Sequence, residues 1–195
     1  MAMPATWPRQ GEWTVEEVWK LPDDGNRHEV IDGVLFVTPS PSLRHQEALG
    51  LVYRILADYL EKELVGWPIV APSDVVFTPR RAVQPDVYVA PLVAGRRPRS
   101  LEDVRHLMLA VEVLSPGSAR QDRIEKRRLY QEHADEYWIV DSDARVMEQW
   151  RSGDERPVIL DSVLRWQPPG AAVPLTLDLP AFFRDVWDED PLPGR

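Results

Sequence analysis

The sequence predicts a mixed α/β domain in which one sheet is flanked by helices, and three observations support this. Apolar residues recur at helical spacing through residues 43–64, directly after Ser42, which can cap a helix. A nearly continuous apolar run at 107–114 is typical of a strand buried on both faces. Strand-like and helix-like segments alternate along the rest of the chain, so neither an all-helical nor an all-strand architecture is expected.

The length of 195 residues fits one domain with its own core. Residues 1–12 are polar and rich in proline, and residues 188–195 are acidic with two prolines. Both compositions favour chain ends that fray. We therefore expect a flexible N-terminal segment at 1–13, a single domain at 14–187 and a flexible acidic tail at 188–195.

Local signals predict the individual elements in order. Thr14 and Glu17 match a capping box, which predicts a short helix to about residue 20. Residues 27–37 predict two strands joined by a turn at Asp32 and Gly33. The remaining predicted elements are the helix at 43–64, strands at 69–78, 83–90 and 107–114, a turn of helix near 101–104, a helix at 119–132, strands at 136–141, 145–151, 156–161 and 162–166, and a short helix from 179.

The composition excludes several classes of protein. Cysteine is absent, which excludes disulfides, thiolate metal sites and cysteine nucleophiles. No apolar run is long enough for a membrane helix, and the first residues do not resemble a secretory signal, so a cytoplasmic protein is expected. A net charge of −9 argues against a sequence-independent nucleic-acid coat, although the segments 80–105 and 120–128 are locally basic. These segments are either solvated surfaces or, if they meet, a patch for an anionic ligand.

Three carboxylates stand in apolar surroundings. Glu112 lies inside the strand predicted at 107–114, Asp86 lies between Pro85 and a further apolar run, and Glu29 lies near the start of an apolar strand. Burying a carboxylate is costly unless a cation or hydrogen bonds compensate it. Together the three would form an oxygen-rich site for Mg²⁺ or Mn²⁺. The alternatives are a solvent-facing strand position for Glu112, a turn aspartate for Asp86 and a strand-edge residue for Glu29.

A lysine in an arginine-rich helix is the second candidate feature. The chain has 20 arginines and three lysines, and Lys126 lies four residues after Asp122, on the same helical face. A compact ammonium can orient water in ways that a planar guanidinium cannot, so Lys126 is a candidate catalytic residue. The alternative is an ordinary surface ion pair between Asp122 and Lys126.

The histidines provide one further candidate. His45 lies in the first turn of the long helix, where the helix N-terminus disfavours the imidazolium. It could be a neutral hydrogen-bond donor near the site or a purely structural residue. The four histidines form no zinc pattern, and no glycine-rich phosphate loop or GxSxG motif is present.

The order and spacing of these candidate residues closely resemble the pattern of the Uma-type family of putative restriction endonucleases. That family lies within the PD-(D/E)XK nuclease superfamily. The resemblance spans residues 14–185 and rests on short motifs: Glu29 in HEVIDG, His45 after a proline-serine turn, Pro85-Asp86, Glu112 in EVLSP, then Asp122, Lys126, Tyr130 and EYWIVD at 136–141. It implies a restriction-endonuclease-like core with one mixed sheet between helices.

The resemblance also implies residue roles. Asp86 and Glu112 would bind Mg²⁺ or Mn²⁺, Glu29 would bind or orient the metal, and Lys126 would position water. Leu114 stands where the superfamily places its lysine. This departure resembles the family's own pattern, in which the lysine lies in the following helix. The supporting residues are Asp122, His45 and Tyr130.

The expected function is metal-dependent endonuclease activity on DNA. Two alternatives remain: a nuclease-like scaffold that binds nucleic acid or protein without cutting, and a metal-dependent hydrolase of small phosphoesters. We expect a homodimer, because closed two-fold assembly suits an enzyme that cuts two strands. The long helix or the segment around Phe182 and Phe183 could form its interface.

Overall fold

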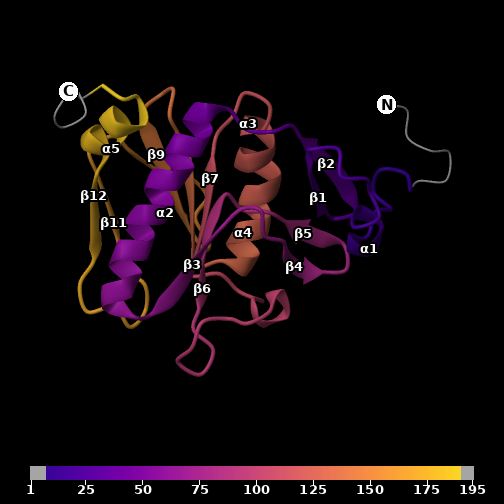
Figure 1. The fold of residues 1–195 in the computed structure, drawn as a ribbon, viewed down its shortest axis with the longest axis horizontal. Helices are drawn as coiled ribbons and strands as arrows, with labels where there is room; N and C mark the ends of the chain where they lie inside the picture. Colours follow the sequence, from indigo (N-terminus) through magenta and orange to yellow (C-terminus); the bar gives the residue numbers. More distant parts are fainter. Residues whose placement is uncertain (1–7, 190–195) are drawn as a thin grey trace.

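A six-stranded mixed sheet forms the centre of the molecule in the computed structural model, which describes residues 8–189 (Figure 1). The strand order is β10-β9-β8-β7-β6-β3, and only the β7–β8 pair is parallel. The strands are β3 Gly66–Val70, β6 Val87–Pro91, β7 Leu109–Val113, β8 Glu136–Asp141, β9 Val146–Arg151 and β10 Val158–Leu160.

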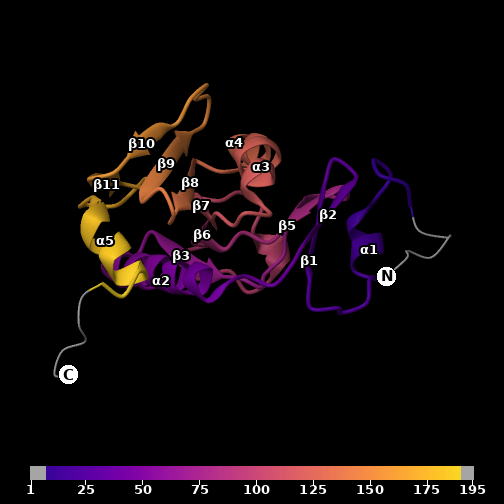
Figure 2. The same cartoon turned by 90° about the horizontal axis from the view of Figure 1, so that it is seen from above.

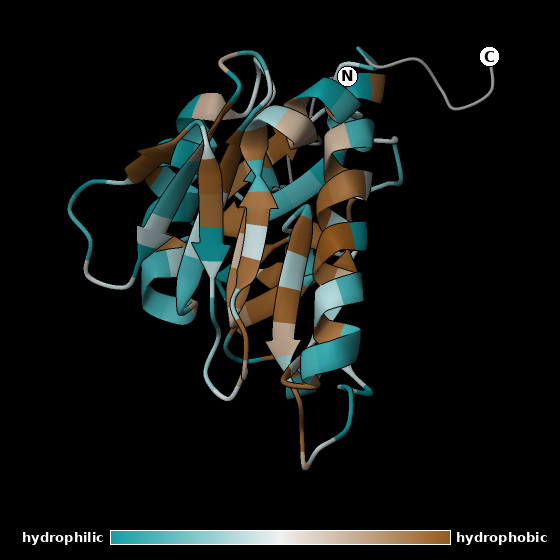
Figure 3. Ribbon diagram, turned by 90° about the vertical axis from the view of Figure 1, so that its left-hand side faces the viewer, coloured by the Kyte–Doolittle hydropathy of each residue, from teal (hydrophilic) through white to brown (hydrophobic). Residues whose placement is uncertain are grey.

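Helices cover both faces of this sheet, as the view from above shows (Figure 2). On one face lie α2 (Leu43–Glu63) and α5 (Leu179–Val186), which pack against the sheet together with the two-stranded ladder of β11 (Val163–Trp166) and β12 (Leu175–Asp178). On the other face a helical segment from α3 to α4 covers β7 and β8. The central strands are largely hydrophobic and form the middle of the core (Figure 3).

The segment from α3 to α4 is one helix with a change of hydrogen-bond pattern inside it. It consists of α3 (Ala119–Gln121), a π-helical turn η2 (Asp122–Lys126) and α4 (Arg127–His133). In the π turn the Arg127 N–H donates to the carbonyl of Asp122, five residues earlier. Such turns are rare and occur frequently at functional sites. The helix predicted at 119–132 is present, but the π turn is not visible in the hydrophobic pattern.

A second, four-stranded sheet lies at one end of the molecule (Figure 1). Its order is β2-β1-β5-β4, and α1 packs on it over a small core centred on Trp13 and Val30. Thr14 caps α1 with the predicted capping box. The elements are α1 Val15–Val18, β1 Arg27–Ile31, β2 Val34–Thr38, β4 Val75–Thr78 and β5 Arg81–Val83, and the short 3-10 turn η1 Leu101–Asp103 packs near β4.

The chain ends differ in part from expectation. Residues 8–13 adjoin the packed domain, because Gly11 and Trp13 donate backbone hydrogen bonds to the carbonyl of Gly33 and the Trp13 side chain is buried. Residues 1–7 of the predicted flexible segment, and 190–195 of the predicted tail, lie outside the described residues. The domain bounds of 14–187 remain a prediction.

The predicted α/β class is confirmed, with more sheets than expected. The strands at 27–38 and 75–83 form their own sheet, and β12, which was not predicted, pairs with β11. Phe182 and Phe183 are buried in the chain's own core, so these two side chains are not available for the dimer interface suggested for their segment. No helix in the described part of the chain has the length and apolarity to cross a membrane.

Candidate active site

Strand pairing places the two principal carboxylates beside each other. In the antiparallel β6–β7 ladder Val87 lies opposite Val111. Asp86 directly precedes Val87 and Glu112 directly follows Val111, so the two carboxylates come at the same end of this ladder. Both side chains are buried and line one pocket of about 240 Å³, which we call the inner pocket. Asp86 and Glu112 are therefore neighbours on adjacent strands.

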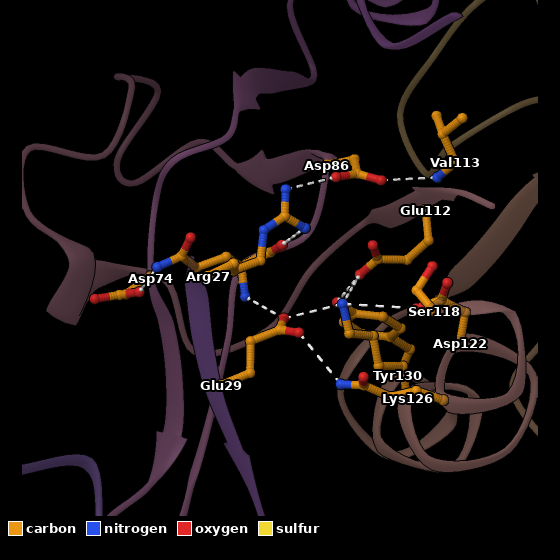
Figure 4. A network of polar contacts seen from close by, with 12 residues as sticks. Arg27, Glu29, Asp74, Asp86, Glu112, Val113, Ser118, Asp122, Lys126 and Tyr130 are labelled. Carbon is orange, nitrogen blue, oxygen red and sulfur yellow. Dashed lines mark hydrogen bonds and ion pairs between the residues drawn. The ribbon is translucent and has the colours of Figure 1, made fainter. Parts of the chain in front are cut away.

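Asp86 is held by three donors from three parts of the chain. The Arg27 guanidinium donates to Asp86 Oδ1 at 2.8 Å, and the Val113 backbone N–H donates to Oδ2 at 2.8 Å. His45 Nε2 lies 3.1 Å from Asp86 Oδ2, within hydrogen-bond distance of that carboxylate oxygen. These contacts fix the carboxylate in one orientation, and Figure 4 shows those with Arg27 and Val113.

Lys126 lies at the centre of the other carboxylates. Its Nζ is 2.9 Å from Glu29 Oε1, 3.0 Å from Glu112 Oε1 and 3.7 Å from Asp122 Oδ1 (Figure 4). The lysine side chain is only 3% exposed. The reading of Asp122 and Lys126 as an ordinary surface pair is therefore inconsistent with the structure.

Three further hydrogen-bond donors surround the glutamates, and one of them is the Gln121 side-chain amide, which donates to Glu29 Oε2 at 3.3 Å. The Tyr130 hydroxyl donates to Glu112 Oε1 at 2.8 Å, one turn beyond Lys126 on the same helix. The backbone N–H of Gln84 donates to Glu29 Oε1 at 2.8 Å. Glu29 thus faces Lys126 from β1 and Glu112 faces it from β7, so one ammonium joins the two sheets and the helix.

The cluster contains more carboxyl groups than permanent cations. Four buried carboxylates, those of Glu29, Asp86, Glu112 and Asp122, share the permanent cations Arg27 and Lys126. An excess of negative charge in a low-dielectric site attracts a cation.

The pKa values reflect these surroundings. Burial raises the pKa of Glu112 well above its ordinary value, although the charge of Lys126 opposes the rise. Burial would also raise the pKa of Asp86, but the hydrogen bond from His45 and the charge of Arg27 outweigh it and the pKa is lowered. For Lys126, burial would lower the pKa, but the charges of Glu112 and Glu29 raise it above the ordinary value. The lysine is therefore a fixed positive charge.

The carboxylates that line the inner pocket fit an ion such as Mg²⁺, which needs only a few ligands from the protein. Among the described residues, no three His, Cys, Asp or Glu side chains are grouped to surround an ion. Mg²⁺, however, is commonly held by one or two carboxylates, with water and substrate phosphate completing the shell. Asp86 and Glu112 suit this role, because both reach the inner pocket. Glu29 is occupied by Lys126, Gln84 and Gln121, so its position suits holding the lysine better than holding the metal.

Sequence reasoning missed Arg27, which lines the inner pocket and bonds Asp86. A signal for it was present: Arg27 and Glu29 are two residues apart on a strand and therefore share a face. His28, which was assigned no role, points elsewhere and lies 3.8 Å from Asp24. Every residue predicted for the site, including the supporting residues His45, Asp122 and Tyr130, contacts another member of the cluster.

The fold is that of a restriction-endonuclease-like protein. The chain belongs to the Uma2 family, described as "Putative restriction endonuclease", whose model matches residues 15–186. This confirms the family resemblance seen in the sequence.

A solved structure has the same fold. It is the crystal structure of a putative nuclease belonging to DUF820 from Anabaena variabilis ATCC 29413, with a TM-score of 0.73 and 19% sequence identity. The match covers 89% of this chain and 99% of that chain. No curated protein matches the sequence.

Proposed function

We propose that this protein is a Mg²⁺- or Mn²⁺-dependent endonuclease that hydrolyses phosphodiester bonds in DNA. The observation that carries the proposal is that buried Asp86 and Glu112 line the same inner pocket, with the Lys126 ammonium 3.0 Å from Glu112. Family membership supports the nuclease class.

In this proposal Asp86 and Glu112 hold the metal ion on the inner pocket. When bound, the ion supplies Lewis-acid polarisation of the phosphodiester and a water of lowered pKa. Arg27, His45 and the Val113 N–H keep Asp86 oriented, so its oxygens need not reorganise when the substrate arrives.

Lys126 contributes a fixed positive charge beside the reacting phosphate. Its ammonium stabilises the negative charge that develops on the phosphoryl oxygens and helps to orient the attacking water. Glu29 and Asp122 hold the ammonium in place, and this is the role that we assign to both residues. Because the lysine is supplied by the helix rather than by β7, Leu114 can stand two residues after Glu112 without loss of the charge.

The test is nicking of supercoiled plasmid DNA by the purified protein. We expect nicking with Mg²⁺ or Mn²⁺, none with EDTA, and none by Asp86→Asn in either metal. Unchanged activity of Asp86→Asn would identify a contaminating nuclease and contradict the assignment. Absence of nicking by the wild-type protein in both metals would instead favour the non-cutting scaffold.

A further inference from the structure

A second pocket lies directly beside the inner pocket. This outer pocket, of about 600 Å³, shares four lining residues with the inner one, namely Ser42, His45, Ser115 and Pro116. It extends to Arg44, to Arg123 on the π turn and to the turn between β8 and β9. The start of α2 therefore forms a common wall between the two pockets.

The N-terminus of α2 carries free hydrogen-bond donors at this wall. Ser42 caps the helix, with its hydroxyl accepting from the His45 N–H and its carbonyl accepting from the Gln46 N–H. The N–H groups of Leu43 and Arg44 have no acceptor within the helix, as is general for the first turn. The helix is 21 residues long, and its dipole adds partial positive charge at this end.

A buried side chain at the same place has an unsatisfied polar atom. His45 is 8% exposed and lines both pockets, and its Nδ1 has no hydrogen-bond partner among the described residues. If Nε2 donates to Asp86, Nδ1 of the neutral ring is an acceptor. A nucleotide can satisfy both features at once, because it carries a phosphate for the helix N-terminus and base N–H groups that can donate.

Arg44 is positioned to hold that phosphate at the open side. Its guanidinium lies 3.5 Å from the centre of the Trp187 ring, and the Trp187 indole donates to the carbonyl of Ser142. Its ion pair with Asp143 is loose, at 3.6 Å between two exposed groups. A phosphate can replace such a carboxylate at little cost.

We propose that the N-terminus of α2, with Arg44, binds the nucleotide next to the scissile phosphate. This inference rests on the proposed function and deepens it, because it makes the substrate a polynucleotide strand rather than a small phosphoester with one phosphate. The scissile phosphate lies in the inner pocket and the neighbouring phosphate in the outer pocket.

The experiment measures binding without cleavage. Fluorescence anisotropy of a fluorescein-labelled single strand of eight deoxyadenosines is recorded with the wild-type protein in EDTA, at several salt concentrations. The variants are Arg44→Ala, Asp143→Asn and, as the matched control on an exposed position of the same helix, Arg54→Ala.

We expect Arg44→Ala to weaken binding about tenfold, because a charge-assisted phosphate contact is lost. Its log–log dependence of affinity on salt should become shallower by about 0.7, the contribution of one phosphate contact on a single strand. Asp143→Asn should tighten binding about threefold by removing the competing carboxylate. Arg54→Ala should match the wild-type protein.

No binding of the strand, or equal affinity and salt dependence in all four proteins, overturns the inference. The proposed function fails separately. If the strand binds with the expected pattern but no metal produces nicking, the pocket binds a nucleotide and the nuclease proposal is wrong. If plasmid is nicked but Arg44→Ala binds like wild type, the nuclease proposal stands and this inference is wrong.

Discussion

The molecule buries two groups of carboxylates, which differ in the partners that surround them. Glu136 on β8 accepts hydrogen bonds from the Trp138 indole at 2.6 Å and from Gln149 at 2.5 Å. Glu148 on β9 accepts from Arg123 at 2.6 Å and lines neither the inner nor the outer pocket. We call Glu136 and Glu148 the β8–β9 carboxylates.

The site carboxylates are arranged differently. Glu29, Glu112 and Asp122 share one ammonium, and Asp86 and Glu112 face a pocket. Burial alone therefore does not indicate chemistry, since both groups are buried. What distinguishes the site is a group of carboxyl groups that outnumber their cations beside a space that a cation and a substrate can enter.

The largest expected effect is on cleavage, and it separates the two groups. Glu112→Gln keeps the shape of the side chain but removes a metal-binding charge, so plasmid nicking should fall at least about a hundredfold. Glu136→Gln, the matched change at a β8–β9 carboxylate, should nick plasmid within about twofold of the wild-type rate. Equal losses of nicking in the two variants would contradict the claim that only the site carboxylates serve cleavage.

Substitutions of Lys126 test whether cleavage needs only a positive charge at this position or specifically an ammonium group. Lys126→Ala should abolish nicking while metal affinity changes little, and it should cost about 3–5 kcal/mol of stability, because three carboxylates lose their buried partner. Lys126→Arg keeps the charge but should also be poorly active, since a planar guanidinium cannot take the position of the ammonium. Chemical denaturation measures the stability and plasmid nicking the activity. Full activity of Lys126→Arg would exclude a specific role for the ammonium.

Tyr130 provides a smaller effect on stability. Tyr130→Phe removes the hydroxyl that donates to Glu112, and it should lower the free energy of unfolding by about 1.5–3 kcal/mol, the range for a bond to a charged group. Tyr137→Phe removes a bond to a neutral carbonyl, that of Asp122, and should cost about 1 kcal/mol. Urea unfolding of both variants gives the comparison, and a larger loss for Tyr137→Phe would contradict it.

The smallest expected effect is on the pH dependence of the Tm when a β8–β9 carboxylate is replaced. Burial raises the pKa of Glu136, despite the hydrogen bonds from Trp138 and Gln149. A carboxyl with a raised folded-state pKa favours folding most at low pH, and this benefit is lost as pH rises through that pKa. Glu136→Gln should therefore raise the Tm slightly at pH 7, and the difference should shrink below about pH 4. A Tm difference that grows toward low pH would contradict this sign.

Local sequence patterns predicted most of the helices and strands and most of the residues of the candidate site. Glu112 was identified because an acidic residue inside an apolar strand needs compensation. Lys126 was identified because a lysine in an arginine-rich helix suits the orienting of water, and the resemblance supported that role. Arg27 was missed because the partner of a strand arginine depends on which strand end lies opposite, here the start of β6 near Asp86. The π turn was missed because one extra residue in a helical turn hardly changes a hydrophobic stripe, and β12 was missed because its partner β11 is needed to define it.

A metal-binding titration tests the central claim, that the site carboxylates hold a divalent cation, most directly. Isothermal calorimetry with Mn²⁺ should show one site in the wild-type protein, binding at least about tenfold weaker in Asp86→Asn, and unchanged binding in Glu136→Gln. Wild-type protein that binds no Mn²⁺, or Asp86→Asn that binds it with wild-type affinity, would contradict the account.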